Sequence, residues 1–507
     1  MPDFKKVGSA LVSVYHKDGL EPLLQHLHQS GVTLYATGGT RDFILSLGMP
    51  VCAVEDVTDY PSILGGRVKT LHPKVFGGIL GRRDNESDVA QLENYQIPPI
   101  DLVIVDLYPF AKTLESGASQ EDIIEKIDIG GISLIRAAAK NFNDVVIVPS
   151  LQDYASVLGE LTANSNQTSL EFRKRMAARA FAVSSHYDTC IYKWFAPEED
   201  SFFKSSIMDH QVLRYGENPH QKGIFYGSPD QVFEQLSGKE LSYNNLLDID
   251  AALSLVYDFS EPVTAILKHN NACGVASGPD SLLNWKLALE SDPVSAFGGI
   301  IVTTAEVDEQ LAAEIGKLFF EVLMAPAFTP AALAILTEKK NRMILRLKDI
   351  TPQAKQFRTV LNGVLWQDRD ARVEKTADLQ TATRIAPSAD QVRDLLFANT
   401  VVKHSRSNTI VLAKNNRLIA AGVGQTSRVD ALRQAIDKAN SFGLSLEGAV
   451  MASDAFFPFP DCVEIAGNAG ITAVIQPGGS KKDQESIDYC DAHGITMVLT
   501  GTRHFRH

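Results

Sequence analysis

Short apolar runs alternate with amphipathic stretches along residues 1–150. Residues 10–15 (ALVSVY) and 32–36 (VTLYA) are apolar and partly β-branched, and residues 19–31 (GLEPLLQHLHQSG) between them carry apolar positions at helical spacing. Two later segments, 101–110 and 143–150, contain continuous apolar runs of strand length. Such runs are typical of parallel strands that helices cover on both faces. The pattern predicts a doubly wound parallel sheet.

A long helical pattern over 169–195 ends in the Pro- and acid-containing segment 196–206, so we predict a domain boundary near residue 200. Further strand-length apolar runs follow, again with helical patterns between them, at 263–269, 298–304, 409–415, 473–476 and 496–500. Residues 264–276 and 409–424 share an apolar strand, a basic residue, an Asn pair and a Gly. This similarity hints at two related halves, although such patterns also recur by chance.

Length and composition restrict the class of protein. At about 150 residues per domain, 507 residues predict two to four domains. The net charge of −13 excludes sequence-independent binding to nucleic acid, which requires a broad basic surface. The sequence contains neither a run of about 18 apolar residues nor a signal-peptide core, so we expect no membrane partner and a cytoplasmic location. The five cysteines form no CxxC pair, which favours a reducing compartment.

Two glycine-rich turns precede predicted helices. Thr37, Gly38, Gly39 and Thr40 follow the strand at 32–36, and Gly130 and Gly131 open an amphipathic stretch that ends near Lys140. A glycine turn at a helix N-terminus offers free N–H groups to a phosphate, although one such turn alone more often only satisfies backbone geometry. The segment 65–74 (GGRVKTLHPK) adds four basic residues, which form either a solvated loop or an anion site.

Several motifs carry a resemblance to a known family. GGRVKTLHP (65–73), DLYPF (106–110) and IDIGGISLIRAAAKN (127–141) resemble the cyclohydrolase part of the bifunctional purine-biosynthesis family, aminoimidazolecarboxamide ribonucleotide (AICAR) formyltransferase/IMP cyclohydrolase. Further motifs resemble the formyltransferase part of that family: RYGENPHQ (214–221), LSYNNLLDIDAA (241–252), LKHNNACGVA (267–276), DPVSAFGGI (292–300), SRSNTIVLAKN (405–415), GQTSRVDA (424–431), SDAFFPF (453–459) and RHFRH (503–507). These motifs run through the whole chain in family order, which is not a plausible accident.

The resemblance implies an α/β fold with two domains. Residues 1–198 would form a methylglyoxal-synthase-like IMP cyclohydrolase domain. Residues 199–507 would form the formyltransferase domain, built of two cytidine-deaminase-like halves that divide near 360–380. The implied reactions are the last two steps of IMP biosynthesis: formyl transfer from 10-formyltetrahydrofolate to AICAR, and dehydrative closure of the product FAICAR to IMP.

The ligands implied are therefore AICAR, FAICAR or IMP, and the folate co-substrate. The family also implies a homodimer with formyltransferase sites at the subunit interface, and leaves room for a structural potassium ion.

Formyl transfer needs proton removal from a weakly nucleophilic amine and stabilisation of charge on the formyl oxygen. By resemblance, His269 transfers the proton, Lys268 acts on the folate side, and Asn408 orients the formyl group. The resemblance gives a further set of residues roles in binding nucleotide or folate, namely Arg214, Tyr215, Phe297, Glu321, Arg428, Phe456, Pro458, Arg503 and His507.

Ring closure depends on positioning a weak amide nucleophile and on stabilising an oxyanion. By resemblance, Lys69 and Tyr108 polarise the formyl oxygen, while Asp128 and Lys140 handle the proton of the attacking amide. The residues implied to hold the phosphate and nucleotide are Lys17, Thr37, Gly38, Gly39, Thr40, Arg67, Thr70, Gly130 and Gly131.

The chain departs from the family pattern in a few places. Tyr15 and His16 stand where S-V-S-D-K is expected, and Ala272 replaces Pro after the Asn pair. Although the family's formyltransferase part resembles zinc deaminases, the chain has no H-x-E followed by P-C-x-x-C, so we expect no transition metal. Cys273 next to the Lys-His pair could be a nucleophile, but formyl transfer needs no covalent intermediate, which favours a packing role.

Two alternatives stay open at this level. A catalytically inactive nucleotide or folate sensor would keep the fold and the phosphate contacts, but it would not need Lys268, His269 and Lys140. A methylglyoxal synthase would use the N-terminal fold but would leave the C-terminal part without a role.

Overall fold

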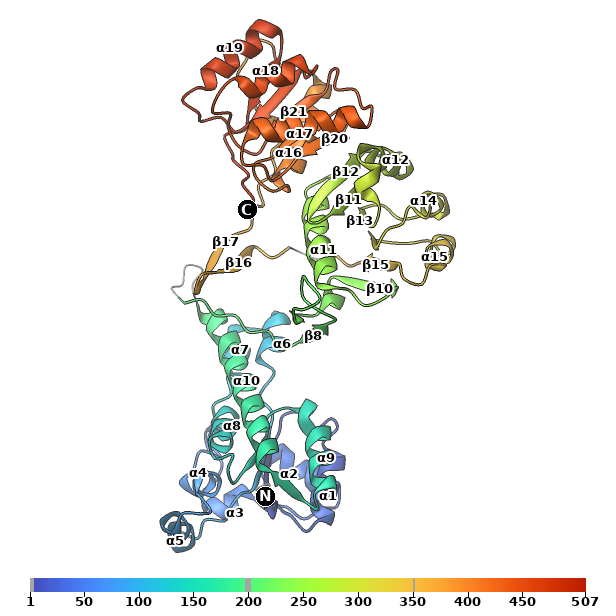
Figure 1. Cartoon of the computed structure of the whole chain (residues 1–507). Helices are drawn as coiled ribbons and strands as arrows, with labels where there is room; N and C mark the ends of the chain where they lie inside the picture. The colour runs from blue at the N-terminus through green and yellow to red at the C-terminus, as the bar shows by residue number, and fades with distance from the viewer. Residues whose placement is uncertain (1–3, 197–201, 350–351) are drawn as a thin grey trace. The chain divides into compact units, whose positions relative to one another are not determined.

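The computed structural model describes residues 4–196, 202–349 and 352–507, and it divides into two compact units, Met1–Met208 and Asp209–His507 (Figure 1). The boundary predicted between residues 198 and 199 lies outside the described residues. Each unit has its own sheets and its own apolar core. None of the described helices combines the length and apolar character needed to cross a membrane.

The first unit is built on a five-stranded sheet in the order β4-β3-β2-β5-β6. The strands are β2 (Ser9–Ser13), β3 (Thr33–Ala36), β4 (Cys52–Ala53), β5 (Leu102–Val105) and β6 (Val146–Val148). All four neighbouring pairs are parallel, which confirms the predicted parallel sheet. A separate antiparallel pair joins β1 (Phe4–Lys6) to β7 (Gln167–Ser169).

Most helices of this unit bury apolar side chains, either in the core around the sheet or in a smaller separate cluster. Their bounds are α1 (Glu21–Gln29), α2 (Gly38–Ser46), α3 (Val54–Thr58), α4 (Pro73–Leu80), α5 (Glu86–Asn94), α6 (Phe110–Glu115), α7 (Gln120–Ile124), α8 (Gly130–Lys140), α9 (Tyr154–Ala163) and α10 (Leu170–Phe195). In α1 the buried positions Leu23, Leu24 and Leu27 have helical spacing. The helix predicted over 169–195 is α10, with Ser169 as its N-cap.

The second unit contains two six-stranded sheets of identical topology. The first has the order β10-β15-β14-β13-β11-β12 and the second β18-β23-β22-β21-β19-β20. Their strands are β10 (Phe233–Ser237), β11 (Val263–Lys268), β12 (Asn271–Ser277), β13 (Ile300–Thr303), β14 (Val322–Ala325), β15 (Met343–Leu347), β18 (Gln380–Thr381), β19 (Ile410–Ala413), β20 (Leu418–Gly422), β21 (Val450–Ser453), β22 (Ala473–Gln476) and β23 (Thr496–Leu499). In both sheets only the second to fourth strands run parallel to one another. The weak sequence similarity between the two segments is thus a true structural repeat.

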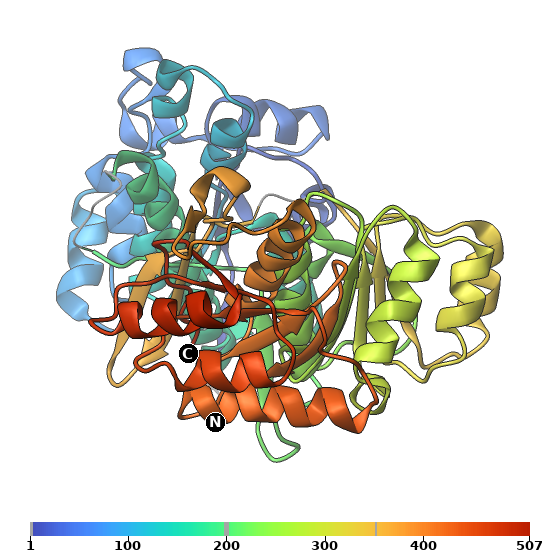
Figure 2. The ribbon, with the colours of Figure 1, turned by 90° about the horizontal axis from the view of Figure 1, so that it is seen from above.

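Helices cover both faces of these sheets (Figures 1 and 2). They are α11 (Tyr243–Val256), α12 (Ser281–Ser291), α13 (Pro293–Ala296), α14 (Glu309–Ile315), α15 (Pro330–Thr337), α16 (Ala389–Lys403), α17 (Arg428–Ser441), α18 (Asp461–Asn468) and α19 (Asp483–His493). One apolar core contains residues of α11, of α16 and of both sheets, so the two halves fold around a common interior. The outer faces have separate cores, one with α12, α14 and α15 and one with α17, α18 and α19.

Two hairpins complete the second unit. One pairs β8 (His210–Leu213) with β9 (Gly223–Tyr226), and the other pairs β16 (Lys355–Val360) with β17 (Gly363–Asp368). Every residue of β16 and β17 is exposed. The first six-stranded sheet ends in sequence with β15 at Leu347, and the second begins with β18 at Gln380.

Candidate active sites

The carboxyl edge of the parallel sheet in the first unit gathers many of the predicted residues. Lys17 follows β2, the Thr37–Thr40 turn follows β3, and Tyr108 follows β5. Because β3, β2 and β5 are parallel neighbours, the three connections leave the sheet at the same edge. Ligands of open α/β sheets bind at this edge.

Positive charge is concentrated there. A Cβ added to Gly38 would lie 4.0 Å from the Lys69 Nζ atom, so the ammonium group adjoins the glycine turn. The Lys17 Nζ donates to the carbonyl oxygens of Val14, at 2.6 Å, and Tyr15, at 2.9 Å. Burial lowers the pKa of Lys17, nearby Asp106 opposes this shift, and Lys69 adds to it. Two ammonium groups beside the N-terminus of α2 suit a phosphate.

Tyr108 and Asp128 lie together next to this cradle. Asp128 is 9% exposed, and its Oδ1 accepts a hydrogen bond from the Gly131 N–H at 2.6 Å. Burial raises the pKa of Asp128, while backbone N–H groups of Gly131 and Tyr108 oppose that shift. Burial, with the charge of Asp128 next, also raises the pKa of the Tyr108 phenol. The pair therefore combines a neutral O–H donor with a buried carboxyl group.

Thr70 and the second glycine turn belong to the same neighbourhood. A Cβ on Gly130 would lie 3.2 Å from the Thr70 Oγ1. Arg67, in contrast, forms an ion pair with Glu125, and its side chain is 64% exposed. Among the described contacts, the Arg67 guanidinium therefore points to an acid rather than to the phosphate turn.

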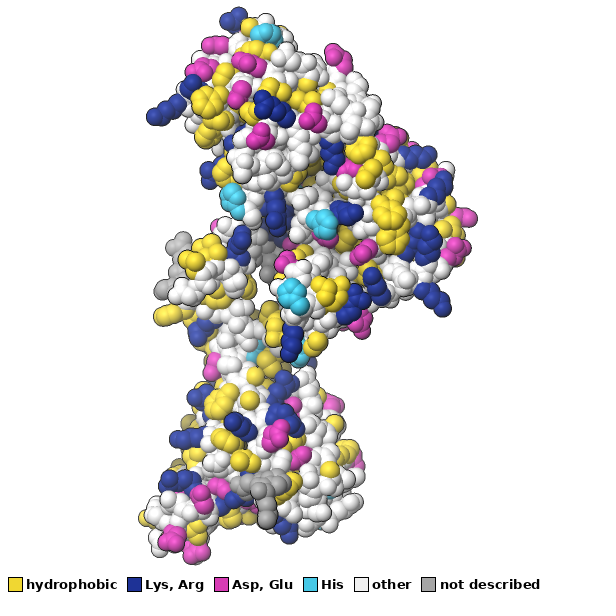
Figure 3. Space-filling model, in the orientation of Figure 1, with side chains coloured by type: hydrophobic (Ala, Val, Ile, Leu, Met, Phe, Trp, Pro, Cys, Tyr) yellow, Lys and Arg dark blue, Asp and Glu magenta, His cyan; other side chains and the backbone are white. Residues whose placement is uncertain are grey.

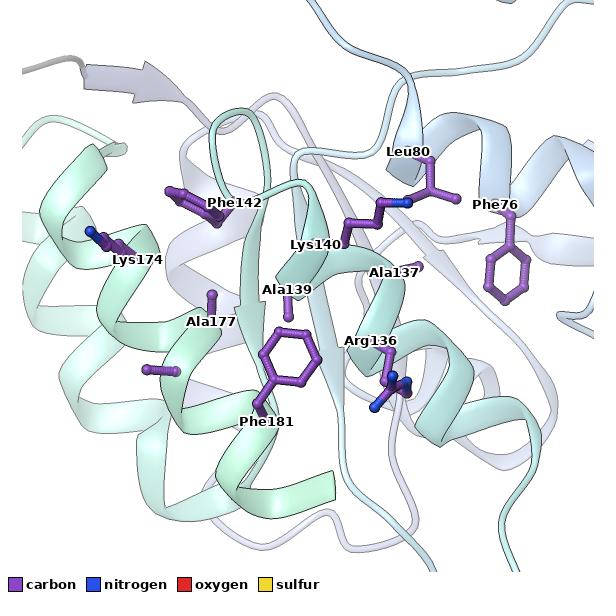
Figure 4. A pocket seen from close by; sticks show the side chains of 11 residues that line it. Phe76, Leu80, Arg136, Ala137, Ala139, Lys140, Phe142, Lys174, Ala177 and Phe181 are labelled. Atoms are coloured by element: carbon purple, nitrogen blue, oxygen red, sulfur yellow. The ribbon is translucent and has the colours of Figure 1, made fainter. Parts of the chain in front are cut away.

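Lys140 lies away from Asp128. The two residues flank α8, whose 11 residues at about 1.5 Å each span about 15 Å. Lys140, Arg136 and Lys174 line a pocket of about 690 Å³ with an apolar wall that includes Phe142 and Phe181 (Figure 4). Within one chain, the length of α8 thus separates Lys140 from Asp128.

In the second unit, the turn between β11 and β12 carries the Lys-His pair. Lys268 ends β11, and its Nζ donates to the Phe297 carbonyl oxygen at 2.8 Å. His269 and Asn270 have left-handed φ values of 53° and 64°. Asp248 of α11 accepts a hydrogen bond from the Asn270 N–H at 2.6 Å, which fixes the turn to the helix.

An acidic group completes this neighbourhood. Burial raises the pKa of Asp248; the Asn270 N–H and then His269 oppose the shift, and Glu321 adds to it. The Glu321 Oε2 accepts a hydrogen bond from the Asn245 Nδ2 at 2.8 Å. Glu321 and the turn that carries His269 thus contact neighbouring turns of α11, through Asn245 and Asp248.

The second half repeats this turn with different chemistry. Asn415 and Asn416 have φ values of 56° and 52°, and Asp394 of α16 accepts from both of their N–H groups. Asn415 stands where the first half has His269. Both halves therefore have the same turn, but only the first half carries an imidazole there.

Another group of predicted residues surrounds Asn408 and the C-terminal segment. The Asn408 Nδ2 donates to the carbonyl oxygens of Gln425, at 3.0 Å, and Thr426, at 3.2 Å. Arg428 forms an ion pair with buried Asp454 at 3.2 Å. The guanidinium groups of Arg428 and Arg503 lie 5.8 and 4.3 Å from the ring centroid of Phe505. Asn408 and these two cations therefore share the region where the chain ends.

The remaining predicted residues are more dispersed. Phe456 and Pro458 follow β21, and the His507 carbonyl oxygen accepts from Arg358 at 3.1 Å. Arg214 lies 4.7 Å from the ring centroid of Tyr215, beyond the end of β8. The hydrogen bonds of Arg214, Lys268 and Asn408 among the described residues go to other partners.

Some side chains at these sites were not predicted from the sequence. They are Asp106 and Lys126 in the first unit, and Asn245, Asp248 and His504 in the second. Asn245 and Asp248 lie in a motif that the family shares, and Ser242 and Asn245 form a capping box, which is a readable signal. Asp106 lies in the DLYPF motif, but its contact with His16 has no sequence signal, because the two residues are 90 positions apart.

The described residues contain no group of three His, Cys, Asp or Glu side chains placed to hold a metal ion. Cys273 is buried, and its Sγ contacts the Ile266 carbonyl oxygen at 3.3 Å. Burial raises the pKa of this thiol to about 12, which disfavours the nucleophilic thiolate.

Two family models match different parts of the chain, and their matches adjoin at residues 133–138, which lie within the first unit. Sequence models of the MGS-like domain and of the AICARFT/IMPCHase bienzyme match residues 19–133 and 138–438. The bifunctional purine biosynthesis protein PurH of Bacteroides thetaiotaomicron is 61% identical over 507 residues, with 100% of both chains covered. The PurH of Bartonella bacilliformis is 47% identical over 528 residues, covering 100% of this chain and 98% of its own.

A crystal structure of ForH is 35% identical and covers 38% of this chain and 100% of its own, with a TM-score of 0.33. The matched residues and the full-length identities together establish the family. The chain belongs to the AICARFT/IMPCHase bienzyme family.

Proposed function

We propose that the two units divide the two activities of this bifunctional enzyme of purine biosynthesis. The chain transfers a formyl group from 10-formyltetrahydrofolate to AICAR and closes FAICAR to IMP. Residues 1–198 form the cyclohydrolase domain and residues 199–507 the formyltransferase domain. The observation that carries this assignment is the separation of two kinds of chemistry: a phosphate cradle with Tyr108 and Asp128 in one unit, and the Lys268–His269 turn in the other.

For formyl transfer, His269 removes the proton from the AICAR amine as the amine attacks the formyl carbon. Its left-handed backbone holds the imidazole at the tip of a turn that Asp248 anchors. Lys268, held by the Phe297 carbonyl oxygen, supplies positive charge at the formyl oxygen and a proton to the departing folate nitrogen. Glu321 binds the pterin, and Asn408 orients the formyl group.

For ring closure, the carboxamide nitrogen of FAICAR attacks the formyl carbon and water leaves. Lys69 and the neutral phenol of Tyr108 donate to the oxygen that becomes the oxyanion and then departs. Asp128, buried but close to backbone N–H groups, accepts the amide proton. Lys17 and the Thr37–Thr40 turn hold the phosphate, with Thr70, Gly130 and Gly131 beside the base. Arg67 can contact the nucleotide only if its ion pair with Glu125 breaks. Lys140 can contact it only if the end of α8 moves closer or if a second subunit contributes this lysine.

A homodimer would cover an exposed apolar feature of the second unit. The β16–β17 hairpin exposes apolar side chains, which supports an interface there. Val364, Leu365 and Trp366 on this hairpin are 38%, 58% and 48% exposed. We therefore assign the formyltransferase sites to the interface between two subunits, and the nucleotide contacts to Arg214, Tyr215, Arg428, Phe456, Pro458, Arg503 and His507.

We include the structural potassium ion that the family implies, while no group of metal-binding side chains among the described residues marks a position for it. Replacing potassium by choline in the assay buffer tests for this ion through the thermal midpoint of unfolding. The location that fits these substrates is the cytoplasm.

The function itself is tested with the purified full chain, AICAR and 10-formyltetrahydrofolate. The expected products are tetrahydrofolate and IMP. If the chain bound both ligands but formed neither product, it would be the inactive sensor instead. Cyclisation of added FAICAR, measured separately, reports the first unit alone.

A further inference from the structure

Tyr15 and His16, which depart from the family pattern, both contact Asp106 in the first unit. Asp106, the first residue of DLYPF, accepts hydrogen bonds at its carboxylate from the backbone N–H groups of Tyr15 and His16, the latter at 2.9 Å. The His16 Nδ1 lies 2.8 Å from the Asp106 Oδ2. The Asp106 side chain is 7% exposed. Because β2 and β5 are parallel neighbours, the two segments leave the sheet side by side, and this carboxylate holds the segment after β2 in place.

The ring that this segment presents packs against Tyr108. The ring centroids of Tyr15 and Tyr108 are 5.5 Å apart with an interplanar angle of 77°, which is an edge-to-face contact. The Lys126 Nζ lies 5.4 Å from the Tyr15 centroid and 5.9 Å from that of Tyr108. Tyr187 of α10 secures the other side of this arrangement, since its hydroxyl donates to the Lys126 carbonyl oxygen and accepts from the Asp128 N–H at 2.9 Å.

The Tyr15 ring thus lies beside Tyr108, and the Lys126 ammonium group lies near both rings. A phenol donor contributes to oxyanion stabilisation only if its oxygen is already at the right place, because reorganisation during the reaction reduces the gain. A displacement of about 1 Å in a catalytic group can cost about 100-fold in rate. An aromatic ring fixed by a buried carboxylate can provide this restraint, whereas the serine of the expected S-V-S-D-K pattern cannot pack against the phenol in this way.

We propose that Tyr15 is a positioning residue for ring closure: held by Asp106, its ring fixes the Tyr108 phenol in the cyclohydrolase site. Tyr15 is 43% exposed, so it forms a wall of the open edge rather than part of the core. The inference rests on the proposed cyclohydrolase activity of this unit. Tyr15 affects the rate through Tyr108 and forms no bond with the substrate.

The test measures cyclisation of FAICAR by full-length variants. Tyr15→Ala is expected to lower kcat about 10- to 100-fold with KM changed less than about threefold. Tyr15→Phe retains the ring and is expected to stay within about threefold of the parent chain. Tyr95→Ala, which removes a 62% exposed tyrosine at the end of α5, is the matched control and leaves kcat unchanged.

A second background separates positioning from direct contact. If Tyr15 acts through Tyr108, adding Tyr15→Ala to Tyr108→Phe lowers kcat by less than about twofold further, because the effects are not additive. Full additivity, a loss confined to KM, or a loss in Tyr15→Phe equal to that in Tyr15→Ala would each overturn the inference.

Crystal structures of the same variants give a readout that needs no activity. The Tyr108 ring is expected to change its side-chain dihedral angles in Tyr15→Ala and to keep them in Tyr15→Phe. An unmoved Tyr108 in Tyr15→Ala contradicts the inference even if kcat falls. If the parent chain did not cyclise FAICAR, the proposed function would fail, while the ring positions would still decide whether Tyr15 holds Tyr108.

Discussion

His269 and Asn415 occupy equivalent positions in the two hairpin turns of the second unit, and both adopt left-handed φ values. Asn tolerates this conformation readily, whereas a histidine there is uncommon. The Asp248 carboxylate accepts a hydrogen bond from the first turn, and the Asp394 carboxylate accepts two from the second. Each carboxylate stabilises its own turn. The first half thus uses the same backbone geometry to present an imidazole that the second half lacks, which fits a single formyl-transfer chemistry in the repeat.

Cys273, four residues after His269, provides a test of the mechanism at a single side chain. Because burial raises its pKa to about 12, the thiol stays protonated at neutral pH. Cys273→Ala is expected to keep kcat for formyl transfer within about threefold, as no covalent step uses the sulfur. Tetrahydrofolate release measured on the folded variant checks this. A loss of 100-fold or more, as expected for a nucleophile, would contradict it.

Single residues also mark the limit of what the sequence could predict. Glycine turns and the Lys-His pair at a strand end are local, so their positions followed from pattern and resemblance. The contact of His16 with Asp106 and the separation of Lys140 from Asp128 are not local: one depends on strand order and the other on the length of α8. Arg67 pairs with Glu125, which a basic cluster in the sequence does not indicate.

At the level of elements, a glycine controls how closely each edge strand approaches its helix. A Cβ on Gly274 of β12 would lie 1.9 Å from the Ala288 carbonyl oxygen of α12, and one on Gly422 of β20 would lie 1.8 Å from the Ala431 carbonyl oxygen of α17. Both halves therefore need glycine for the same strand–helix contact. The sequence indicates the strands and helices, but not that these glycines allow the contact.

Gly274→Ala is expected to destabilise the second unit by about 1–3 kcal/mol or more, because helix backbone cannot move aside as a side chain can. Urea unfolding followed by fluorescence measures the change. Gly159→Ala is the control: Gly159 lies in α9 with no atom within 4 Å of its added Cβ, and the helix is expected to gain about 0.5–1 kcal/mol. Equal stability of Gly274→Ala and the parent would show that the strand and helix are not packed this closely.

The C-terminal segment is anchored by a buried ion cluster. His504 is 2% exposed, with its Nδ1 2.6 Å from Asp370 and its Nε2 3.1 Å from Glu374. Burial opposes the imidazolium charge, but the hydrogen bonds to Asp370 and Glu374 outweigh it and raise the pKa to about 9. Neighbouring Arg503 and His507 are proposed nucleotide contacts, so this cluster fixes the backbone that presents them.

Because the folded-state pKa of His504 is raised above its unfolded value near 6.5, its contribution to stability is complete below about pH 6.5 and is lost as the pH rises through about 9. We expect the parent chain to lose on the order of 1–3 kcal/mol of unfolding free energy from this group between pH 7 and 9.5. His504→Gln should have lower stability at pH 7 and a shallower decline. Parallel pH profiles of the two proteins would disprove the role of His504.

For the whole molecule, fold class was more predictable than assembly. Continuous apolar runs predicted the parallel sheet, and a weak internal similarity corresponds to two sheets of identical strand order. Lys and Arg are interspersed with acidic side chains over the face shown in Figure 3. The net charge of −13 is still compatible with anionic substrates, because ammonium groups lie next to the phosphate turn. The exposure of the apolar side chains on the β16–β17 hairpin, however, could not be predicted from the sequence, because the pattern does not show which apolar residues stay outside a core.

The exposed hairpin leads to a prediction about the dimer. Leu365→Asp on β17 is expected to shift the chain from dimer towards monomer in sedimentation velocity, and to reduce formyl transfer while leaving cyclisation of FAICAR nearly unchanged. Gln367→Asp on the same strand is a control that adds the same charge without removing an apolar side chain. A monomeric parent chain with full formyl transfer would contradict the assignment of these sites to a subunit interface.

If two separate units carry two separable activities, His269→Ala should affect only one of them. The full-length variant is assayed for formyl transfer from 10-formyltetrahydrofolate to AICAR and, in parallel, for cyclisation of FAICAR. We expect formyl transfer to fall by about 100-fold or more, since a general base is lost, and cyclisation to stay within about twofold of the parent chain. Loss of both activities in a folded variant, or retention of formyl transfer, would contradict this expectation.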